Sequence, residues 1–529
     1  MSPRCRLPYI AVQPSLPHVI ADILAPGSSI AVEDCWVSCY APAPPDHRQA
    51  RDGRNEMLSV HGKIRLAESD EKEGEVECLN RDERVQVEMR SQSEFTVACP
   101  ELAISETTIL FPSPQSNTLL PTPSASSSSY NPTTQELPPA SFHRLAARGR
   151  RGGIETFALS SDGRRVVVGG MDGMASVVEV VEQVVGGEGG RTARTRLAKG
   201  KETPLRGHVG DLTDAAFFPS NEVVLTASSD MILRVFSALD GTSPRTLKSH
   251  SKRVTSLHIL ASPTSTGPHK GRLVLSSSLD GTIRLWDVST SSNEQTWTLS
   301  QPISKMLIVS SDTEEDAEDV LKGKKALAAH TDGTVSIVDL TADSTAAASS
   351  SRGGVYAAPV LLRTSSGSPI ETISVLAARE GWIATGSRNG VVSLFRLSEG
   401  FTAAKGPLEL LLEWTRTEGG SSILDVELSK RLRTSGSCAP SRDEDRESFS
   451  LLVAPSDGLA YRAVITPPHS PAATANQAEP IPALPHVRVV EEFVGPDCEP
   501  TTGITEDERG RVWISAGGTD GGLRVYERD

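Results

Sequence analysis

The chain has 529 residues and a formal charge of −14 at pH 7, whereas nucleic acids and anionic membranes are bound by basic surfaces. We therefore expect neither nucleic acid nor a membrane as its partner, and an acidic chain suits basic protein partners better. The seven cysteines are odd in number and scattered, which suits a reducing compartment. Prolines interrupt the N-terminal region, unlike a secretory signal, and no apolar run reaches the roughly 18 residues that span a bilayer. We therefore expect the protein in the cytosol, the nucleus or both.

Residues 1–111 are predicted to form a small β-rich domain. Apolar and polar residues alternate there in short bursts, which is the pattern of half-buried strands. The clearest bursts are DCWVSCYA at 34–41, KIRLAE at 63–68, RVQVEMR at 84–90 and FTVACP at 95–100.

Four cysteines of this domain raise the question of a metal site. Cys35 and Cys39 lie on one predicted strand and would face the same side of it. A structural zinc site needs four ligands in paired short spacings, and Cys78 and Cys99 supply no second pair. We therefore expect no metal, and we interpret the cysteines as small core residues of a reduced protein.

Residues 112–140 are predicted to be a linker between two domains. Their sequence, PSPQSNTLLPTPSASSSSYNPTTQELPPA, is rich in Pro and Ser. Such a composition buries too little apolar surface to offset the entropy of ordering the chain.

One pattern recurs seven times between Arg165 and the C-terminus. It consists of an apolar strand, small residues, an acidic or amide turn and a second strand, and its best copy is LVLSSSLDGTIRLWDV at 273–288. Asp followed by Gly suits a tight turn because Gly adopts positive φ without strain, so each copy predicts a β-hairpin. The turn residues lie 50 to 68 positions apart, at Asp172, Asp230, Asp280, Asp332, Asn389, Asp457 and Asp520.

These repeats predict the architecture of the rest of the chain. Another apolar run precedes each hairpin and a short outer segment follows it, so each unit holds about four strands. Such a sheet has two apolar faces, which a radial array of neighbours can cover. We predict an all-β fold, with a seven-bladed β-propeller over 141–529 behind the small β-rich domain. Because the last unit ends after its third strand, we expect 141–148 to supply the fourth and close the ring.

The best repeats resemble the WD40 family, whose signature is a Gly-His pair, an acidic turn and a Trp-Asp pair. Gly207 and His208 precede Asp230, and Trp286 and Asp287 follow Asp280. The resemblance implies a buried hydrogen-bonded relay in two units. Its members would be His250, Asp280, Ser276 and Trp286 in the third unit, and His208, Asp230 and Thr226 in the second, where Phe236 replaces the Trp.

A closer resemblance is to the proteasomal ATPase-associated factor family. It rests on residues 205–241, on DCWVSCYAP near the N-terminus and on VGPDCEP at 494–500. The resemblance implies a monomeric, non-catalytic chaperone without cofactors. It also implies binding to the C-terminal region of an ATPase subunit of the proteasome regulatory particle, and a role in assembly of the base.

The resemblance to propellers also implies a binding face, rimmed by the turns between the second and third strands of the blades. The candidate residues are Met171, Ser229, Leu279, Thr331, Arg388, Ser456 and Thr519 in these turns, and Asp211, Lys252 and Arg253 in the loops before the first strands.

Two other functions stay open. One is a WD40 adaptor, such as a ubiquitin-ligase substrate receptor, although the β-rich N-terminal region does not resemble a helical recruiting segment. The other is an enzyme on a propeller scaffold. The histidines near Asp and Ser lack a nucleophile elbow, and the Gly-rich stretches lack the phosphate-binding pattern. We therefore predict no catalytic residues and no enzyme activity.

Overall fold

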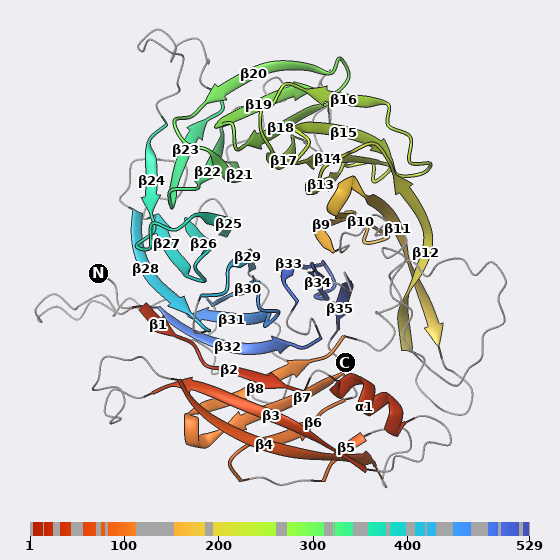
Figure 1. The fold of residues 1–529 in the computed structure, drawn as a ribbon, viewed down its shortest axis with the longest axis vertical. Coiled ribbons are helices and arrows are strands. Elements are labelled where there is room, and N and C mark those ends of the chain that lie inside the picture. Colours follow the sequence, from red (N-terminus) through yellow and green to blue (C-terminus); the bar gives the residue numbers. More distant parts are fainter. Residues whose placement is uncertain are drawn as a thin grey trace, which may run out of the picture.

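A ring of sheets dominates the structure, which is a computed structural model (Figure 1). In the described part of the chain seven sheets form this ring, and we call them blades 1 to 7 in chain order. The prediction of an all-β propeller fold is confirmed. The described residues are 4–13, 15–24, 32–43, 57–69, 76–79, 83–91, 93–112, 153–185, 194–260, 272–310, 321, 323–341, 358–376, 381–397, 408–417, 420–429, 448–466, 485–495, 499–517 and 522–527.

Within each blade the strands run outward from the centre in chain order, and each is antiparallel to the next. Blade 1 contains β9 (Ile154–Leu159), β10 (Arg165–Gly170), β11 (Ala175–Val185) and β12 (Arg194–Leu205). Blade 2 contains β13 (Leu212–Phe217), β14 (Val223–Ser228), β15 (Ile232–Ser237) and β16 (Arg245–Lys248). Blade 3 contains β17 (Val254–Leu260), β18 (Leu273–Ser278), β19 (Thr282–Asp287) and β20 (Ser292–Thr298). Blade 4 contains β21 (Ile303–Ser310), β22 (Lys324–His330), β23 (Thr334–Asp339) and β24 (Val360–Arg363), and blade 5 contains β25 (Ile370–Leu376), β26 (Trp382–Ser387), β27 (Val392–Leu397) and β28 (Leu408–Thr415). Blade 6 contains β29 (Ile423–Ser429), β30 (Phe449–Pro455), β31 (Tyr461–Thr466) and β32 (His486–Phe493). Blade 7 contains β33 (Thr501–Glu506), β34 (Val512–Ala516) and β35 (Leu523–Tyr526).

Each predicted hairpin is the second and third strand of a blade, and the turn residues explain its tightness. In blade 3 the Asp280 Oδ1 accepts a hydrogen bond from the backbone N–H of Thr282 at 2.9 Å. Gly281 between them has a φ of +80°, a conformation that costs glycine little. Asp332 caps the turn of blade 4 in the same way, with Thr334 N at 3.1 Å.

Polar side chains on the innermost strands join neighbouring blades. The Asp214 Oδ2 accepts from Leu257 N of the next blade at 3.0 Å. Equivalent bonds join Ser256 Oγ to Met306 N at 3.0 Å and Asp425 Oδ2 to Ile504 N at 3.1 Å. Because each bond satisfies a backbone donor that has no sheet partner on the channel side, these residues fix the register between blades.

The ring closes between blades 7 and 1. Strand β9 packs against β33 and β34, and the Thr502 Oγ1 donates to the Ile154 carbonyl at 2.6 Å. Blade 7 has three strands among the described residues. The segment 141–148, which we predict as its fourth strand, and the linker 112–140 from residue 113 onward lie outside the described residues.

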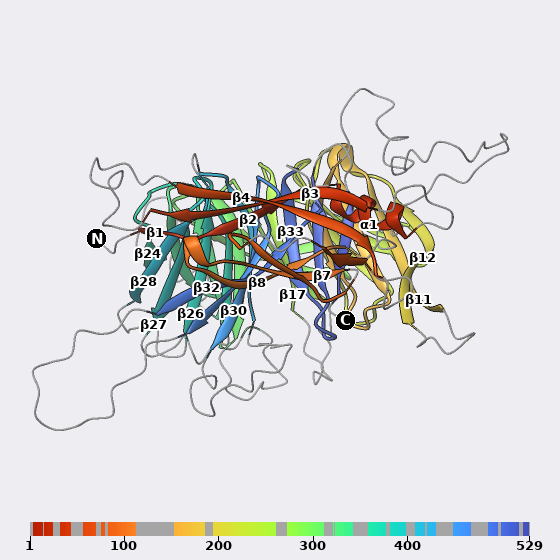
Figure 2. The same ribbon diagram turned by 90° about the horizontal axis from the view of Figure 1, so that it is seen from below.

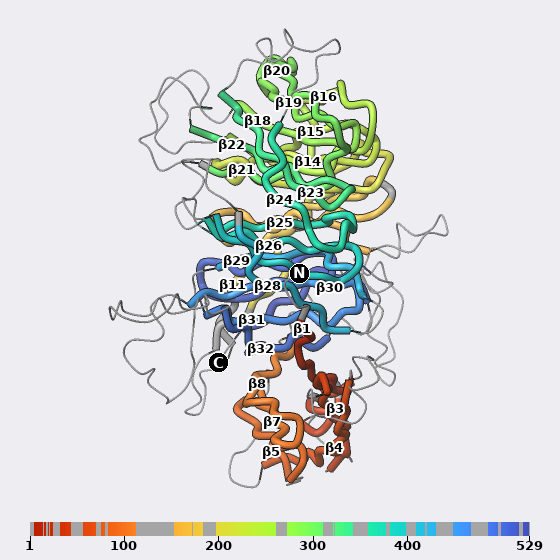
Figure 3. Tube along the Cα trace, turned by 90° about the vertical axis from the view of Figure 1, so that its left-hand side faces the viewer, coloured from red at the N-terminus to blue at the C-terminus, as the bar shows by residue number. Residues whose placement is uncertain are grey.

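The N-terminal region forms a small β-rich domain below the ring (Figure 3). One layer is the sheet β2-β3-β4-β5, and the other contains β6, β7 and β8, with the helix α1 beside them. The bounds are β1 (Arg4–Arg6), β2 (Tyr9–Val12), α1 (Leu16–Ile23), β3 (Val32–Pro42), β4 (Met57–Glu68), β5 (Val76–Cys78), β6 (Gln86–Met89), β7 (Glu94–Cys99), the 3-10 helix η2 (Pro100–Leu102) and β8 (Ile104–Leu110).

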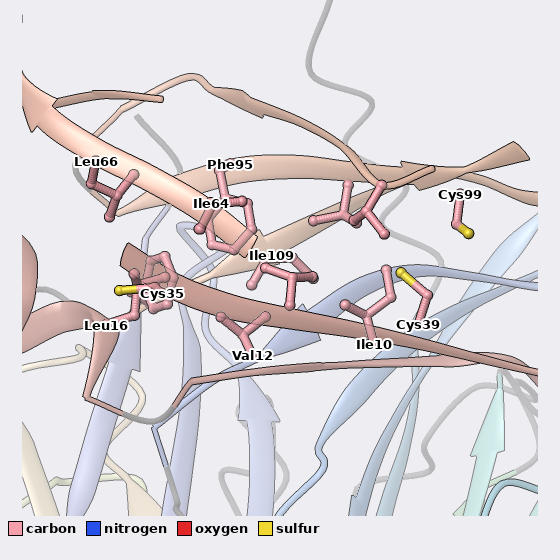
Figure 4. Packing of buried hydrophobic residues seen from close by; sticks show 14 of the residues in the cluster. Ile10, Val12, Leu16, Cys35, Cys39, Ile64, Leu66, Phe95, Cys99 and Ile109 are labelled. Carbon is pink, nitrogen blue, oxygen red and sulfur yellow. The ribbon is translucent and has the colours of Figure 1, made fainter. Parts of the chain in front are cut away.

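Apolar side chains of both layers share one core, in which Cys35, Cys39 and Cys99 are buried (Figure 4). Burial raises the pKa of the Cys35 thiol to about 11 and that of Cys39 to about 12. Both thiols are therefore protonated at neutral pH and pack as small apolar groups. Trp36 lies on the opposite face of β3 and is 41% exposed.

The N-terminal region also adds strands to the propeller, which the sequence did not lead us to expect. Strand β1 pairs in parallel with β28 at the outer edge of blade 5, with Arg4 opposite Glu413. Strand β8 pairs in parallel with β32 at the outer edge of blade 6. Figure 2, seen from below, shows the N-terminal strands in front of the rim of the ring. The chain therefore covers the outer edges of two adjacent blades with its own first strands.

A buried ion pair lies where these parts meet. Arg416, which follows β28, pairs with Glu492 of β32, and their side chains are 6% and 4% exposed. The Glu492 Oε1 also accepts from the backbone N–H of Ile10 in β2 at 3.3 Å. The Arg416 guanidinium lies over the Tyr461 ring, 4.2 Å from its centre. One carboxylate therefore connects blades 5 and 6 with the N-terminal domain.

Candidate protein-interaction face

One face of the ring carries the turns that were predicted to bind a partner. Since the strands of a blade are antiparallel, the turn between its second and third strands lies at the same end as the loop that enters its first strand. Backbone hydrogen bonds join these two segments in five blades. They run from Ser229 N to Asp211 O at 2.8 Å, Leu279 N to Arg253 O at 3.0 Å, Arg388 N to Pro369 O at 2.9 Å, Ser456 N to Ser422 O at 2.8 Å and Gly517 N to Pro500 O at 2.8 Å.

We call this end of the blades the turn face. The described strand ends that flank five inserts within blades 3, 4 and 6 lie at the opposite face. The inserts 261–271, 311–320 and 430–447 connect first to second strands, and 342–357 and 467–484 connect third to fourth strands. From blade 2 to blade 6 the turn face is therefore built from short segments, which suits a surface of defined shape.

In blade 3 the structure brings together His250, Asp280, Ser276 and Trp286. The two ring nitrogens of His250 lie 3.0 Å from the Asp280 Oδ2 and 2.7 Å from the Ser276 Oγ. The Trp286 Nε1 donates to the same Ser276 oxygen at 2.8 Å. Burial opposes ionisation of Asp280, but hydrogen bonds from His250, Thr282 and Ser251 N outweigh it and lower the pKa of the carboxyl well below its ordinary value.

In blade 2 the structure brings together His208, Asp230 and Thr226. His208 lies 2.9 Å from the Asp230 Oδ2 and 2.8 Å from the Thr226 Oγ1. Phe236, which replaces the Trp, is fully buried and has no polar atom to offer, and the Thr226 hydroxyl bonds instead to the Arg234 carbonyl at 3.3 Å. Both relays hold the turn against the entering loop, and both histidines are buried, so their role is to position the backbone of the turn face.

Blade 4 uses a related arrangement that sequence reasoning missed. His330 ends β22, and its ring nitrogens lie 2.9 Å from the Ser336 Oγ and 3.1 Å from the Pro302 carbonyl oxygen. Since this histidine is not preceded by Gly in an entering loop, the Gly-His pattern could not find it. A His that ends the second strand, with a Ser at the facing position of the third strand, is the sequence pattern that could have predicted this arrangement.

The predicted partner-binding residues differ in exposure. Lys252, Arg253 and Arg388 are exposed, although the Arg388 Nε donates to Glu371 Oε1 at 2.7 Å. Thr519 lies outside the described residues. The others are half-buried, and they are Met171, Asp211, Ser229, Leu279, Thr331 and Ser456.

A central cavity of about 740 Å³ runs between the innermost strands, and charged side chains line it. Lys305 Nζ lies 3.9 Å from the Asp214 Oδ2, and Asp425 accepts from the Thr372 hydroxyl at 3.2 Å. In the part of the chain that the structure describes, no group of three or more His, Cys, Asp or Glu is arranged to hold a metal ion. Nor is any helix of the described ranges long and apolar enough to cross a membrane.

Glu427, on the innermost strand of blade 6, gives a pH-dependent stability that can be tested. Burial raises its pKa to about 7, so the folded protein holds a proton there that the unfolded chain releases near pH 4.3. This contribution to stability is therefore present below about pH 4 and is lost as the pH rises to about 7. We expect Glu427→Gln to raise the free energy of unfolding by about 1–3 kcal/mol at pH 8 and by much less at pH 5.

Denaturant unfolding at both pH values measures this difference, and Glu222→Gln, at an exposed site, is the control. Equal effects of Glu427→Gln at the two pH values would contradict the assignment.

Comparison with known proteins agrees with the class of protein that this fold and these relays define. WD40 repeats are present, because residues 200–237 and 241–287 match the family model described as "WD domain, G-beta repeat". The matched residues contain both relays of blades 2 and 3.

Two relatives share part of the chain. It is 43% identical over 53 residues to the 26S proteasome regulatory subunit RPN14 of Saccharomyces cerevisiae, which is 10% of this chain and 13% of that protein. It is 32% identical over 97 residues to Periodic tryptophan protein 2 of Arabidopsis thaliana, which is 18% of this chain and 10% of that protein. The chain thus spans only a small part of the length of either relative.

Proposed function

We propose that this protein is a non-catalytic chaperone that binds an ATPase subunit of the proteasome regulatory particle and assists assembly of its base. The observation that carries the proposal is the 43% identity over 53 residues to a protein named as a regulatory subunit of the 26S proteasome. The resemblance of residues 205–241 and 494–500 to the proteasomal ATPase-associated factor family supports the same partner. The protein acts in the cytosol, the nucleus or both.

The geometry supports recognition across a surface. The turn face is fixed by backbone hydrogen bonds between turns and entering loops, and the relays of blades 2 and 3 hold it from beneath. A rigid surface loses little conformational entropy on binding, which favours a specific protein contact. The proposed partner-binding residues are those of the turns and loops on this face, with Lys252, Arg253 and Arg388 the most accessible.

Purification of the tagged full-length protein from a native lysate tests the partner. We expect regulatory-particle ATPase subunits to be recovered without the mature proteolytic core, and the purified ATPase C-terminal region to bind directly. Charge reversal in Arg253→Glu/Arg388→Glu is expected to weaken this capture at least about tenfold. Recovery of cullin components in place of the ATPases would overturn the proposal in favour of a ubiquitin-ligase adaptor.

A further inference from the structure

Met231 occupies a strained position on the turn face. Its φ is +68°, in the left-handed region, at the turn position where blades 3 to 6 have glycine. Those glycines, with φ near +80°, are Gly281, Gly333, Gly390 and Gly458. Left-handed backbone costs a residue with a Cβ about 1–2 kcal/mol, and the Met231 side chain regains little by packing because it is 41% exposed. Strain of this kind at an exposed apolar residue points to a role in binding.

Val209 lies in the loop that enters blade 2 and is the most exposed large apolar residue in the described part of the chain, at 83%. Its backbone N–H donates to the Asp230 Oδ2 at 3.2 Å, so the loop that carries Val209 lies on the turn that carries Met231. On its other side, Gly173 of the blade 1 turn approaches the His208 carbonyl so closely that a Cβ would lie 2.2 Å from it. Two exposed apolar residues therefore lie on segments that are hydrogen-bonded to each other and supported by the turn of blade 1.

Exposed basic residues lie on the segments next to these two apolar residues. Ile232 pairs with Lys248, so the turn of Met231 and the loop that follows Lys248 leave the same end of β15 and β16. Lys248, Lys252 and Arg253 are exposed on or beside that loop, and the exposed Arg206 begins the loop of Val209.

Two of the three aspartates in these turns and loops, Asp230 and Asp280, point inward, and the third, Asp211, is half-buried. The side chains of Asp230 and Asp280 are each 5% exposed and bind histidine and backbone N–H groups. Among the described residues of these turns and loops, the exposed charged side chains are therefore basic, although the whole chain carries a charge of −14.

We propose that the patch formed by Arg206, Val209, Met231, Lys248, Lys252 and Arg253 docks an acidic segment of a protein partner. An apolar side chain of that segment contacts Met231 and Val209, and its carboxylates pair with the surrounding cations. This inference rests on the proposed function in one respect, that the partner is a protein engaged at the turn face. It reverses the expectation of a basic partner that follows from net charge alone, because the local field decides which segment can bind.

Binding of two fluorescein-labelled peptides to the full-length protein tests the proposal. One peptide has a Leu-Phe pair flanked by glutamates, and the other has lysines in place of the glutamates. We expect the acidic peptide to bind, with an affinity that falls as salt is added, and the basic peptide to bind at least about tenfold more weakly. Preference for the basic peptide, or equal binding of both, would overturn the proposal.

Variants separate binding from folding. Met231→Gly relieves the left-handed strain, so its melting temperature is not expected to fall, whereas acidic-peptide affinity is expected to drop about fivefold. Lys248→Glu/Lys252→Glu is expected to lose about tenfold or more. The control Lys201→Glu/Arg245→Glu makes the same charge change away from the turn face, since Lys201 donates to the Leu239 carbonyl and Arg245 lies at the other end of β16 from Lys248. Unchanged affinity in Met231→Gly, or an equal loss in the control, would refute the patch.

The same variants distinguish this inference from the proposed function. If the protein captures proteasomal ATPases and Met231→Gly and Lys248→Glu/Lys252→Glu capture them equally well, the patch is wrong and the function stands. If the acidic peptide binds through the patch and no ATPase is captured, the partner named above is wrong and the patch stands.

Discussion

Substitution of Trp286 by alanine is expected to lower the free energy of unfolding by about 3–5 kcal/mol, among the largest effects of any single change in the propeller. The Trp286 ring is 1% exposed and packs in the core between blades 2 and 3. Its Nε1 also donates to Ser276, the oxygen that His250 contacts. Alanine leaves a cavity and also removes one hydrogen bond from a buried hydroxyl. Chemical denaturation of the full-length chain measures the loss.

Blade 2 supplies the matched control, because Phe236 occupies the equivalent position there and is fully buried. Trp286→Phe keeps most of the ring volume and loses only the Nε1 donor, so its cost is expected to be about 1 kcal/mol. Equal costs for the alanine and phenylalanine variants would show that packing of the ring contributes little, contrary to the burial that the structure gives it.

Arg416→Met is expected to lower the free energy of unfolding by about 3–5 kcal/mol at pH 8, because it leaves the Glu492 carboxylate buried without its ion-pair partner. Burial already raises the pKa of Glu492 to about 7, against the opposing effect of Arg416. Without the guanidinium this pKa rises further. Glu492 in the folded variant then stays protonated up to a higher pH. The loss of stability is therefore smaller at pH 5 and grows as the pH rises through 7.

The double variant Arg416→Met/Glu492→Gln removes both charges and keeps an acceptor for the Ile10 N–H. We expect it to recover most of the lost stability, since uncharged replacements of a buried pair are often nearly neutral. Denaturation of the two variants at pH 5 and pH 8 measures this. A double variant as unstable as Arg416→Met would show that the ion pair is not the source of the loss.

The hairpins of the propeller could be predicted from the sequence because their causes are local. An Asp or Asn marks each turn and is followed by Gly in every copy except blade 2, and apolar strands on either side need no distant partner to be recognised. The docking of β1 and β8 could not be predicted in this way. Strand β1 is the three residues Arg4–Arg6, too short for any periodicity, and its pairing with β28 depends on an edge supplied by another part of the chain.

The candidate face was only partly predictable for the same reason. The Gly-His pairs marked the relays of blades 2 and 3, which the structure assembles, whereas His330 took a similar role from a different position. The basic patch was missed because total charge averages over residues that face different ways. Asp230 and Asp280 count fully in the total, yet their side chains point into the blades, and the exposed cations beside them do not.

The parallel pairing of β1 with β28 has a consequence for how the protein is made. Cys5 contacts the Glu413 carbonyl across 408 positions of sequence, and Ile10 contacts Glu492 across 482. A ribosome releases β1 and β2 long before it has synthesised the blades that receive them, so these contacts form only after residues 413 and 492 have emerged. These strands are therefore synthesised before blades 5 and 6 and positioned after them, and attachment of the N-terminal domain to the ring is a late step of folding.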